Sequence, residues 1–421
     1  MRTSGLAGNG DGASSDRFVL IDISRTLAAF IVVIWHWQHF FFVGDRLPVG
    51  FDRSIQPFYS VLAPFYLQGG IAVNFFFIVS GFIFFWKYEQ SIGCGETSSW
   101  RFAVARFSRL YPLHLLTLIV VIGLQLIHIS IVGQPFANPD LDLYALLPQL
   151  LLATDWGFDV GRAFNLPAWS ISCEIVAYFA FFLVVRYRLN SFRWVVTYAL
   201  VGLVAMASVR GEIADVLYCF FIGGLIAKLY RRTQEANSLA FLLLSLSAFL
   251  LGLVLVDLNL DGPAFRPVAS MMVSALTTII PPLSALSSKL IGRLTEISVY
   301  LQFSLLLFPG FIGLCASGSR FLAPLIRPLA PFGNLSYAVY LWHFPLQILC
   351  VLTLPALVDS GAGSLYARPS VLILFLVVLT GVSWLSFACY EMPLQRFLRV
   401  RLQRRAPPHA SLTALAEMER L

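Results

Sequence analysis

The sequence predicts an all-α polytopic membrane protein, a bundle of about ten transmembrane helices. Three observations lead to this fold class. Of the 421 residues, 58% are hydrophobic and only 12% are charged, whereas ordinary globular chains carry about 25% charged residues. The apolar residues gather in long runs, and each spanning helix needs roughly 20 of them. Basic residues fall in short clusters between the runs, a distribution that orients membrane proteins.

Ten of the apolar runs are long enough to be spans. They cover residues 18–43, 66–87, 111–133, 169–187, 194–209, 213–230, 239–256, 296–316, 333–354 and 370–390. Two further apolar pieces, 143–153 and 267–288, are expected to be re-entrant or interfacial. Pro281 and Pro282 interrupt the second piece. An eleventh span there would also place the basic clusters that follow it on the outer side of the membrane.

The basic clusters orient the bundle. With ten spans and a cytoplasmic N-terminus, the clusters at 87–109, 186–193, 228–232 and 320–327 all fall inside, together with the basic tail. Both termini are therefore expected in the cytoplasm: a disordered segment at 1–16, a membrane domain at 17–396 and a basic tail at 397–421. We attribute the net charge of +7 to the basic clusters that orient the protein in the membrane. No nucleic acid partner is therefore expected. The six cysteines have no disulfide or metal spacing, so no metal is expected.

The first span contains an arginine and a histidine. Arg25 and His36 are eleven positions apart, which at about 100° per residue brings both to one face, about 16 Å apart along the axis. Ionisable residues inside a span usually line cavities or proton relays, and histidine is the usual general base near neutral pH. The alternative is that Arg25 snorkels and His36 bonds a neighbouring helix. His39, one turn further on, is expected at the membrane interface.

Polar groups also mark the second and third spans. Arg106 and Arg109 lie one turn apart just before the third span, where paired guanidinium groups can grip phosphates. A positive-inside anchor explains them equally well. In the second span Ser80 is a polar group within an apolar run, and Gly81 beside it permits close helix packing.

Carboxylates and aromatic residues mark later spans. Glu174 lies in the fourth span, one turn before Tyr178, and its alternative role is a buried ion pair with an arginine of another span. Tyr337 and His343 lie in the ninth span, where Tyr and Trp usually act as interfacial anchors. Glu391 follows the last span and is expected to be a salt-bridged helix end.

Taken in order, these motifs resemble the acyltransferase-3 family of membrane O-acyltransferases. The motifs are R-x10-H, FFxxSGF, RxxRxYP, WSxxxExxxY, SYxxYLWHxP and YExP, and they run from Asp22 to Arg396. The resemblance implies a roughly ten-helix core that takes acyl groups from cytoplasmic acyl-CoA, acetyl-CoA being the expected donor. The acyl group goes to a hydroxyl of a surface glycan or glycolipid. The expected location is the bacterial inner membrane, with membrane lipid and the glycan acceptor as partners.

The resemblance also assigns roles to residues. His36, Arg25 and Glu174 are the expected catalytic residues, with His36 as general base; Arg106, Arg109 and Arg25 are expected to bind the cofactor, and Ser80, Tyr178, Tyr337 and His343 the substrate. Direct transfer is favoured over an acyl-enzyme, because no base lies beside Ser80 or Cys173 in the sequence. The alternative function is a polytopic transporter or flippase for a lipid-linked glycan, whose path intramembrane ionisable groups would line.

Overall fold

The computed structural model is a helical bundle that contains no strand among the residues it describes, namely 19–137, 141–157, 164–208, 211–236, 238–259, 265–279, 281–357 and 365–403. In this part of the chain nine helices are long and apolar enough to cross a membrane, and a tenth apolar helix, 192–206, is shorter. The predicted all-α polytopic membrane fold is confirmed. The expected disordered segment 1–16 and most of the basic tail lie outside the described residues.

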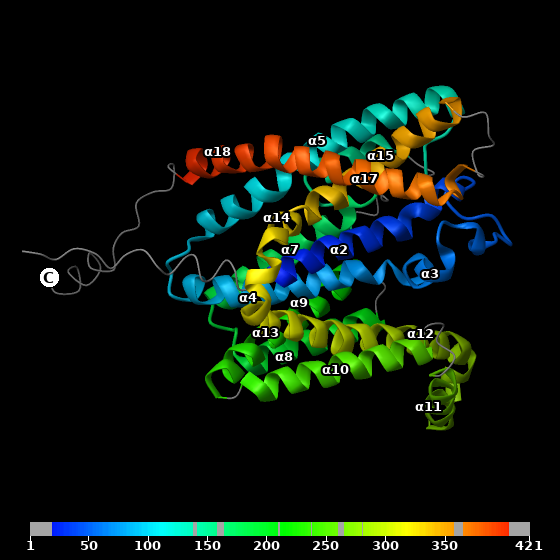
Figure 1. The fold of residues 1–421 in the computed structure, drawn as a ribbon. Coiled ribbons are helices and arrows are strands. Elements are labelled where there is room, and N and C mark those ends of the chain that lie inside the picture. The colour runs from blue at the N-terminus through cyan, green and yellow to red at the C-terminus, as the bar shows by residue number, and fades with distance from the viewer. Residues whose placement is uncertain are drawn as a thin grey trace, which may run out of the picture.

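All ten predicted runs fall on helices that lie side by side in Figure 1. They are α2 (Val19–His36), α4 (Ile71–Gly93), α5 (Ser99–Val132), α7 (Ala168–Arg186), α8 (Phe192–Ser208), α9 (Glu212–Ala236), α10 (Ser238–Asn259), α12 (Ser287–Leu301) continued by a π turn (Gln302–Leu307) into α13 (Phe308–Ile326), α15 (Ser336–Leu357), and α17 (Pro369–Ser386) continued by a π turn (Phe387–Glu391) into α18 (Met392–Gln403). The shorter helices are α3 (Tyr59–Gln68), α6 (Leu146–Leu150), α11 (Arg266–Ile279) and α14 (Ala330–Gly333).

The two interrupted apolar pieces form no span of their own. Residues 267–288 become α11 and a 3-10 turn (Pro281–Leu286) before α12 begins. Figure 1 shows α11 lying across one end of the bundle. Residues 143–153 form another 3-10 turn and α6, which has only five residues. A helix this short cannot cross about 30 Å of hydrocarbon.

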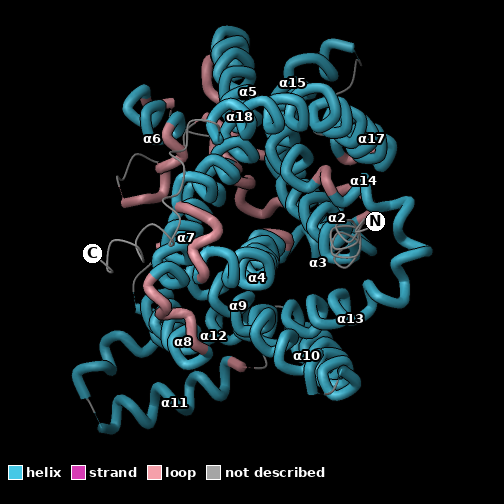
Figure 2. Tube along the Cα trace, turned by 90° about the vertical axis from the view of Figure 1, so that its left-hand side faces the viewer, coloured by secondary structure: helices cyan, strands magenta, loops and turns pink. Residues whose placement is uncertain are grey.

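Close packing of α4 against α9 forms the centre of one half of the bundle. A Cβ added to Gly81 would collide with the Phe220 carbonyl, and one added to Gly223 would collide with the Ile78 carbonyl. The small residues let the two backbones approach, as expected for Gly81. Figure 2 views the bundle nearly end-on and shows α4 and α2 near its middle, between α5, α15 and α17 on one side and α8 and α10 on the other.

Two long helices extend beyond the thickness of a bilayer core. The side chain of Ser98 accepts from the backbone N–H of Arg101 and so caps α5 well before the predicted start of the third span. Its 34 residues give α5 a length of about 51 Å. At the other end of the chain, α18 packs along the first half of α5, and the Trp100 indole donates to the Leu402 carbonyl at 3.0 Å. Because α5 begins at Ser99, Arg106 and Arg109 lie within this one continuous helix.

Candidate active site

A small polar cavity lies between α2, α4, α7 and α15. Its volume is about 50 Å³, and its lining includes Arg25, Ser80, Glu174 and Tyr337, which is room for a few water molecules. These are four of the side chains for which the sequence predicts a function, and they come from four different spans. The structure therefore brings Arg25 and Glu174, two of the expected catalytic residues, to the lining of one cavity.

Glu174 is held by hydroxyl groups. Ser80 Oγ donates to its Oε1 at 2.5 Å, and Tyr178, one turn along α7, lies within hydrogen-bonding reach. Among the residues that the structure describes, no arginine or lysine forms an ion pair with Glu174. The buried ion pair considered as its alternative role is therefore not seen here, and Arg25 faces Glu174 only through the cavity.

Arg25 has few partners for its five N–H groups. Its Nη1 lies 3.8 Å from Asp22 Oδ1, and its side chain is 16% exposed. The buried Nε has no hydrogen-bond partner within the described part of the chain. A guanidinium that is desolvated and poorly paired is costly and is suited to receive an anionic ligand.

The histidines form a second cluster, further along the same helices. His36 Nδ1 lies 2.9 Å from His343 Nε2, and the rings are stacked with centroids 5.0 Å apart. His343 is fully buried and His36 is 8% exposed. The contact joins α2 to α15, which are 307 positions apart in the chain. The hydrogen bond between histidines of two helices could not be seen in the spacing of either motif.

The hydrogen bonds around these histidines define where their protons lie. His343 Nδ1 is 2.6 Å from the carbonyl oxygen of Tyr340, which can only accept, so this nitrogen carries the proton. Nε2 of a neutral His343 then accepts, and His36 must donate to it from Nδ1. The remaining nitrogen, His36 Nε2, is left with a free lone pair and has no hydrogen-bond partner among the described side chains. This is the protonation pattern of a general base.

His39, expected at the membrane interface, is buried in the bundle and belongs to this cluster. Its side chain is 8% exposed and its ring centroid lies 4.8 Å from that of His36. The reason is local: α2 gives way to a 3-10 turn (Trp37–Phe41), in which residues three apart eclipse. The Gln347 amide oxygen accepts from His39 Nδ1 at 3.1 Å, and the Gln347 amide nitrogen donates to the His36 carbonyl at 2.9 Å.

A polar face of α15 connects the cavity with the histidines. It carries Ser336, Tyr340, His343 and Gln347 at spacings of four, three and four, and it spans about 16 Å. Arg25 meets the first half of this face and His36 the second, so α2 and α15 run in parallel and Arg25 and His36 share one face of α2, as predicted. Tyr340 lies at the junction, where its hydroxyl contacts Ser170 Oγ at 2.8 Å.

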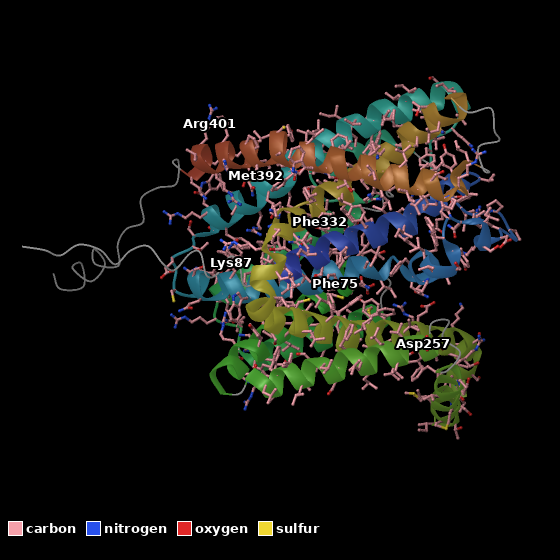
Figure 3. All side chains as sticks on the ribbon, in the orientation of Figure 1. Phe75, Lys87, Asp257, Phe332, Met392 and Arg401 are labelled. Carbon is pink, nitrogen blue, oxygen red and sulfur yellow. The ribbon has the colours of Figure 1, made fainter. Side chains whose placement is uncertain are left out.

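Basic side chains gather where α4 ends and α5 begins. We call Lys87, Arg106, Arg109 and Arg399 the basic rim. Lys87 lies at the same end of the bundle as Arg401 in Figure 3. Arg109 is exposed, forms no hydrogen bond or ion pair within the described ranges, and lies close enough to Arg25 and Glu391 to act on them electrostatically.

The two predicted phosphate ligands are not equivalent. Arg106 is half-buried and donates to the Tyr88 hydroxyl at 2.7 Å, and its guanidinium lies 4.9 Å from the centre of the Phe84 ring. Arg109 is free to contact a ligand. The two arginines project from one side of α5, as predicted, but only one presents an unused charge.

Glu391 and Tyr337 lie near this rim. Glu391 accepts from Ser386 Oγ at 3.1 Å and forms no salt bridge within the described chain, so the predicted salt-bridged helix end is not found. The hydroxyl of Tyr337, an expected substrate-binding residue, donates to the Leu110 carbonyl at 2.6 Å. Both side chains lie inside the bundle between α5, α15 and the second π turn.

An ionic clamp that the sequence motifs did not indicate holds this end of the bundle. Glu89 of α4 is 7% exposed and binds Lys228 and Arg231 of α9, the Arg231 distance being 2.9 Å. Asn190 adds a hydrogen bond at 2.7 Å. The sequence predicts only that Lys228 and Arg231 help to orient the protein in the membrane. In the structure they also neutralise the buried carboxylate of Glu89.

The bundle, the polar cavity and the histidine pair define a polytopic membrane protein with an intramembrane site. Residues 18–388 match the family model described as an acyltransferase domain, and the chain therefore belongs to the acyltransferase-3 family that its motifs predicted. The acyltransferase MdmB of Streptomyces mycarofaciens is 35% identical over 117 residues, which cover 27% of each chain. Protein 2 in the picA locus of Rhizobium radiobacter is 31% identical over 172 residues, 38% of this chain and 78% of the relative. No solved structure matches the chain significantly.

Proposed function

We propose that this acyltransferase moves an acyl group, an acetyl group in the simplest case, from cytoplasmic acyl-CoA to a hydroxyl of a cell-surface or exported glycan. The observation that carries this proposal is the His36–His343 pair, which leaves a free lone pair on a buried imidazole 2.9 Å from a second one. Family membership supports the reaction class. The chain would act in the bacterial inner membrane, with both termini in the cytoplasm.

The donor would enter at the basic rim. Coenzyme A carries phosphates, and Arg109 offers an exposed guanidinium without another partner, so the phosphates would bind there first. The pantetheine arm would then lead inward past Arg25 towards the histidines. Arg25 lines the polar cavity and His36 does not, so we assign Arg25 and Glu174 to donor binding rather than to the reacting carbonyl.

The chemical step would be a direct transfer. The acceptor hydroxyl gives its proton to His36 Nε2 while its oxygen attacks the thioester carbon, and the C–S bond then breaks to release CoA, whose sulfur takes the proton back from the imidazolium. His343 Nε2 would accept from Nδ1–H throughout and stabilise the positive charge. The hydroxyl of Ser80, one candidate nucleophile, donates to the Glu174 carboxylate and not to a histidine.

The test is mass spectrometry of surface glycans from a deletion strain and from strains complemented with the wild-type or the His36→Gln gene. The proposal expects an O-acyl group that is lost on deletion, restored by the wild type and not restored by His36→Gln. In parallel, membranes that contain the wild type should release free CoA from acetyl-CoA. A transporter or flippase would instead change the amount of exported glycan without releasing CoA, and that result would overturn the proposal.

A further inference from the structure

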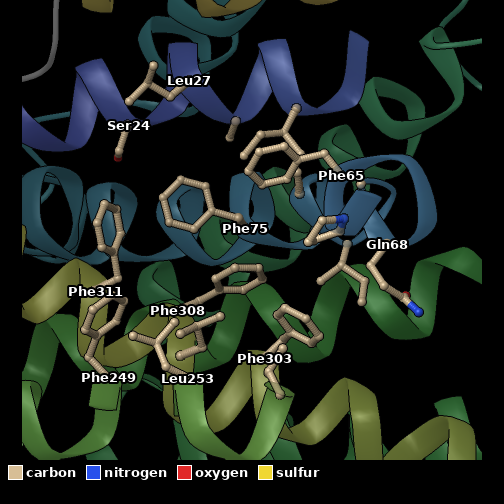
Figure 4. A pocket seen from close by; sticks show the side chains of 18 of the residues that line it. Ser24, Leu27, Phe65, Gln68, Phe75, Phe249, Leu253, Phe303, Phe308 and Phe311 are labelled. Carbon is tan, nitrogen blue, oxygen red and sulfur yellow. The ribbon is translucent and has the colours of Figure 1, made fainter. Parts of the chain in front are cut away.

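A large apolar pocket lies on the other side of α2 from the polar cavity. It has a volume of about 620 Å³, within the range of ligand-binding pockets. Figure 4 shows its walls: Leu27 from α2, Phe75 from α4, Leu253 from α10, and Phe303 and Phe308 from the π turn and α13. All of these elements belong to membrane-spanning segments, so the pocket lies at membrane depth.

The chemistry of the lining identifies the kind of occupant. Ser24, Gln68 and Asp257 are the polar side chains that line the pocket, and the remaining lining is aliphatic, aromatic, Pro or Gly. Water does not fill apolar cavities of this kind, and an empty cavity costs free energy in proportion to its volume. A hydrocarbon chain is apolar and would occupy the volume, so it is the kind of ligand that suits this pocket.

The pocket is open to the lipid side of the bundle. Leu27 is 52% exposed and Leu253 is 44% exposed although both line the pocket. A bilayer lipid can therefore reach the pocket sideways, between α2 and α10. The donor-binding elements, by contrast, lie on the opposite face of α2.

The polar residues of the lining are not spread evenly. In Figure 4 Gln68 lies at one end of the pocket, and Ser24 and Phe311 lie towards the other end. Asp257 lies at the end of the bundle opposite Lys87 in Figure 3. It is exposed and forms no ion pair with any described residue. A carboxylate at the mouth of an apolar pocket attracts an amine and repels an anion.

We propose that this pocket binds one membrane lipid, with its hydrocarbon chain between α2, α4 and α10 and an amine-bearing head group beside Asp257. The site is separate from the acyl-transfer reaction, and its test needs no acyl donor.

The experiment uses the full chain, reconstituted in vesicles of equal parts phosphatidylethanolamine and phosphatidylglycerol, then extracted and weighed by native mass spectrometry. We expect one retained lipid per chain, with phosphatidylethanolamine favoured severalfold. Leu253→Trp should fill the pocket and reduce retention about tenfold. Leu251→Trp is the matched control, since Leu251 lies on the same helix, is 49% exposed and does not line the pocket; it should retain the lipid.

Asp257→Asn tests the head group without changing the volume of the pocket. It should keep the lipid but bring the ratio of the two phospholipids close to one. The proposal is overturned if the wild type retains no lipid, if both tryptophan variants lose it equally, or if Asp257→Asn leaves the preference unchanged.

Discussion

Replacing His343 by alanine tests whether this residue makes His36 a base. In the structure His343 Nε2 accepts from His36 Nδ1 at 2.9 Å, and that bond becomes charge-assisted once His36 takes a proton. Hydrogen bonds to charged groups contribute about 1.5–3 kcal/mol, and a factor of ten in rate corresponds to about 1.4 kcal/mol. We therefore expect His343→Ala to lower the rate of acyl transfer by about tenfold to a hundredfold.

His36→Gln should cost more, because it removes the proton acceptor itself. A general base contributes about 10² to 10⁴ in rate, which corresponds to about 2.7–5.4 kcal/mol. The double variant should be no slower than His36→Gln alone, since His343 has nothing left to assist. Couplings of this kind are what a double-mutant cycle measures.

The assay is release of free CoA from acetyl-CoA by membranes that carry the glycan acceptor, with binding of acetyl-CoA measured separately. His128→Ala is a matched control: His128 is also buried, with its Nδ1 2.7 Å from the Gln134 carbonyl, but it lies outside both clusters. Two results would refute the assisting role of His343. One is full activity in His343→Ala, and the other is a double variant whose loss of rate equals the product of the two single losses.

Three more predictions follow from the structure. Arg109→Ala should weaken acetyl-CoA binding, and more at low salt than at high salt because the contact is ionic; titration calorimetry at two ionic strengths measures this, and equal affinity at both would contradict it. Glu89→Gln leaves two cations of the ionic clamp without their carboxylate and should cost about 3–5 kcal/mol of stability, seen as a lower melting temperature in detergent, whereas the exposed Glu96 changed to Gln should have little effect. Cysteine labelling should find both termini in the cytoplasm and the segment with Lys289 and Arg293 outside; cytoplasmic labelling of that segment would revise the topology.

Much of the fold could be predicted from composition and charge, since a long apolar run between basic clusters has few ways to satisfy its backbone except as a spanning helix. The periodicity of a single helix also placed Arg25 and His36 on one face and paired Glu174 with Tyr178. These predictions depend on geometry within one helix, which the sequence determines locally.

Contacts between helices could not be predicted in the same way. His343 lies 307 positions from His36, and the two cations that bind Glu89 lie 139 and 142 positions from it. No spacing rule connects such distant residues. Local departures from α geometry had a similar effect. The 3-10 turn after α2 turned His39 inward, and the π turns at Gln302–Leu307 and Phe387–Glu391 shift the face that every later residue presents.

The position of α2 between the polar cavity and the apolar pocket has a consequence for the strength of the site. Only α2 and α4, which line both, separate the charge of Arg25 from a hydrocarbon compartment. In a medium of low dielectric constant an anion is attracted more strongly than in water. The affinity of Arg25 for an anionic ligand should therefore depend on what occupies the far side of α2. A lipid chain there would strengthen the electrostatic attraction, and water there would weaken it.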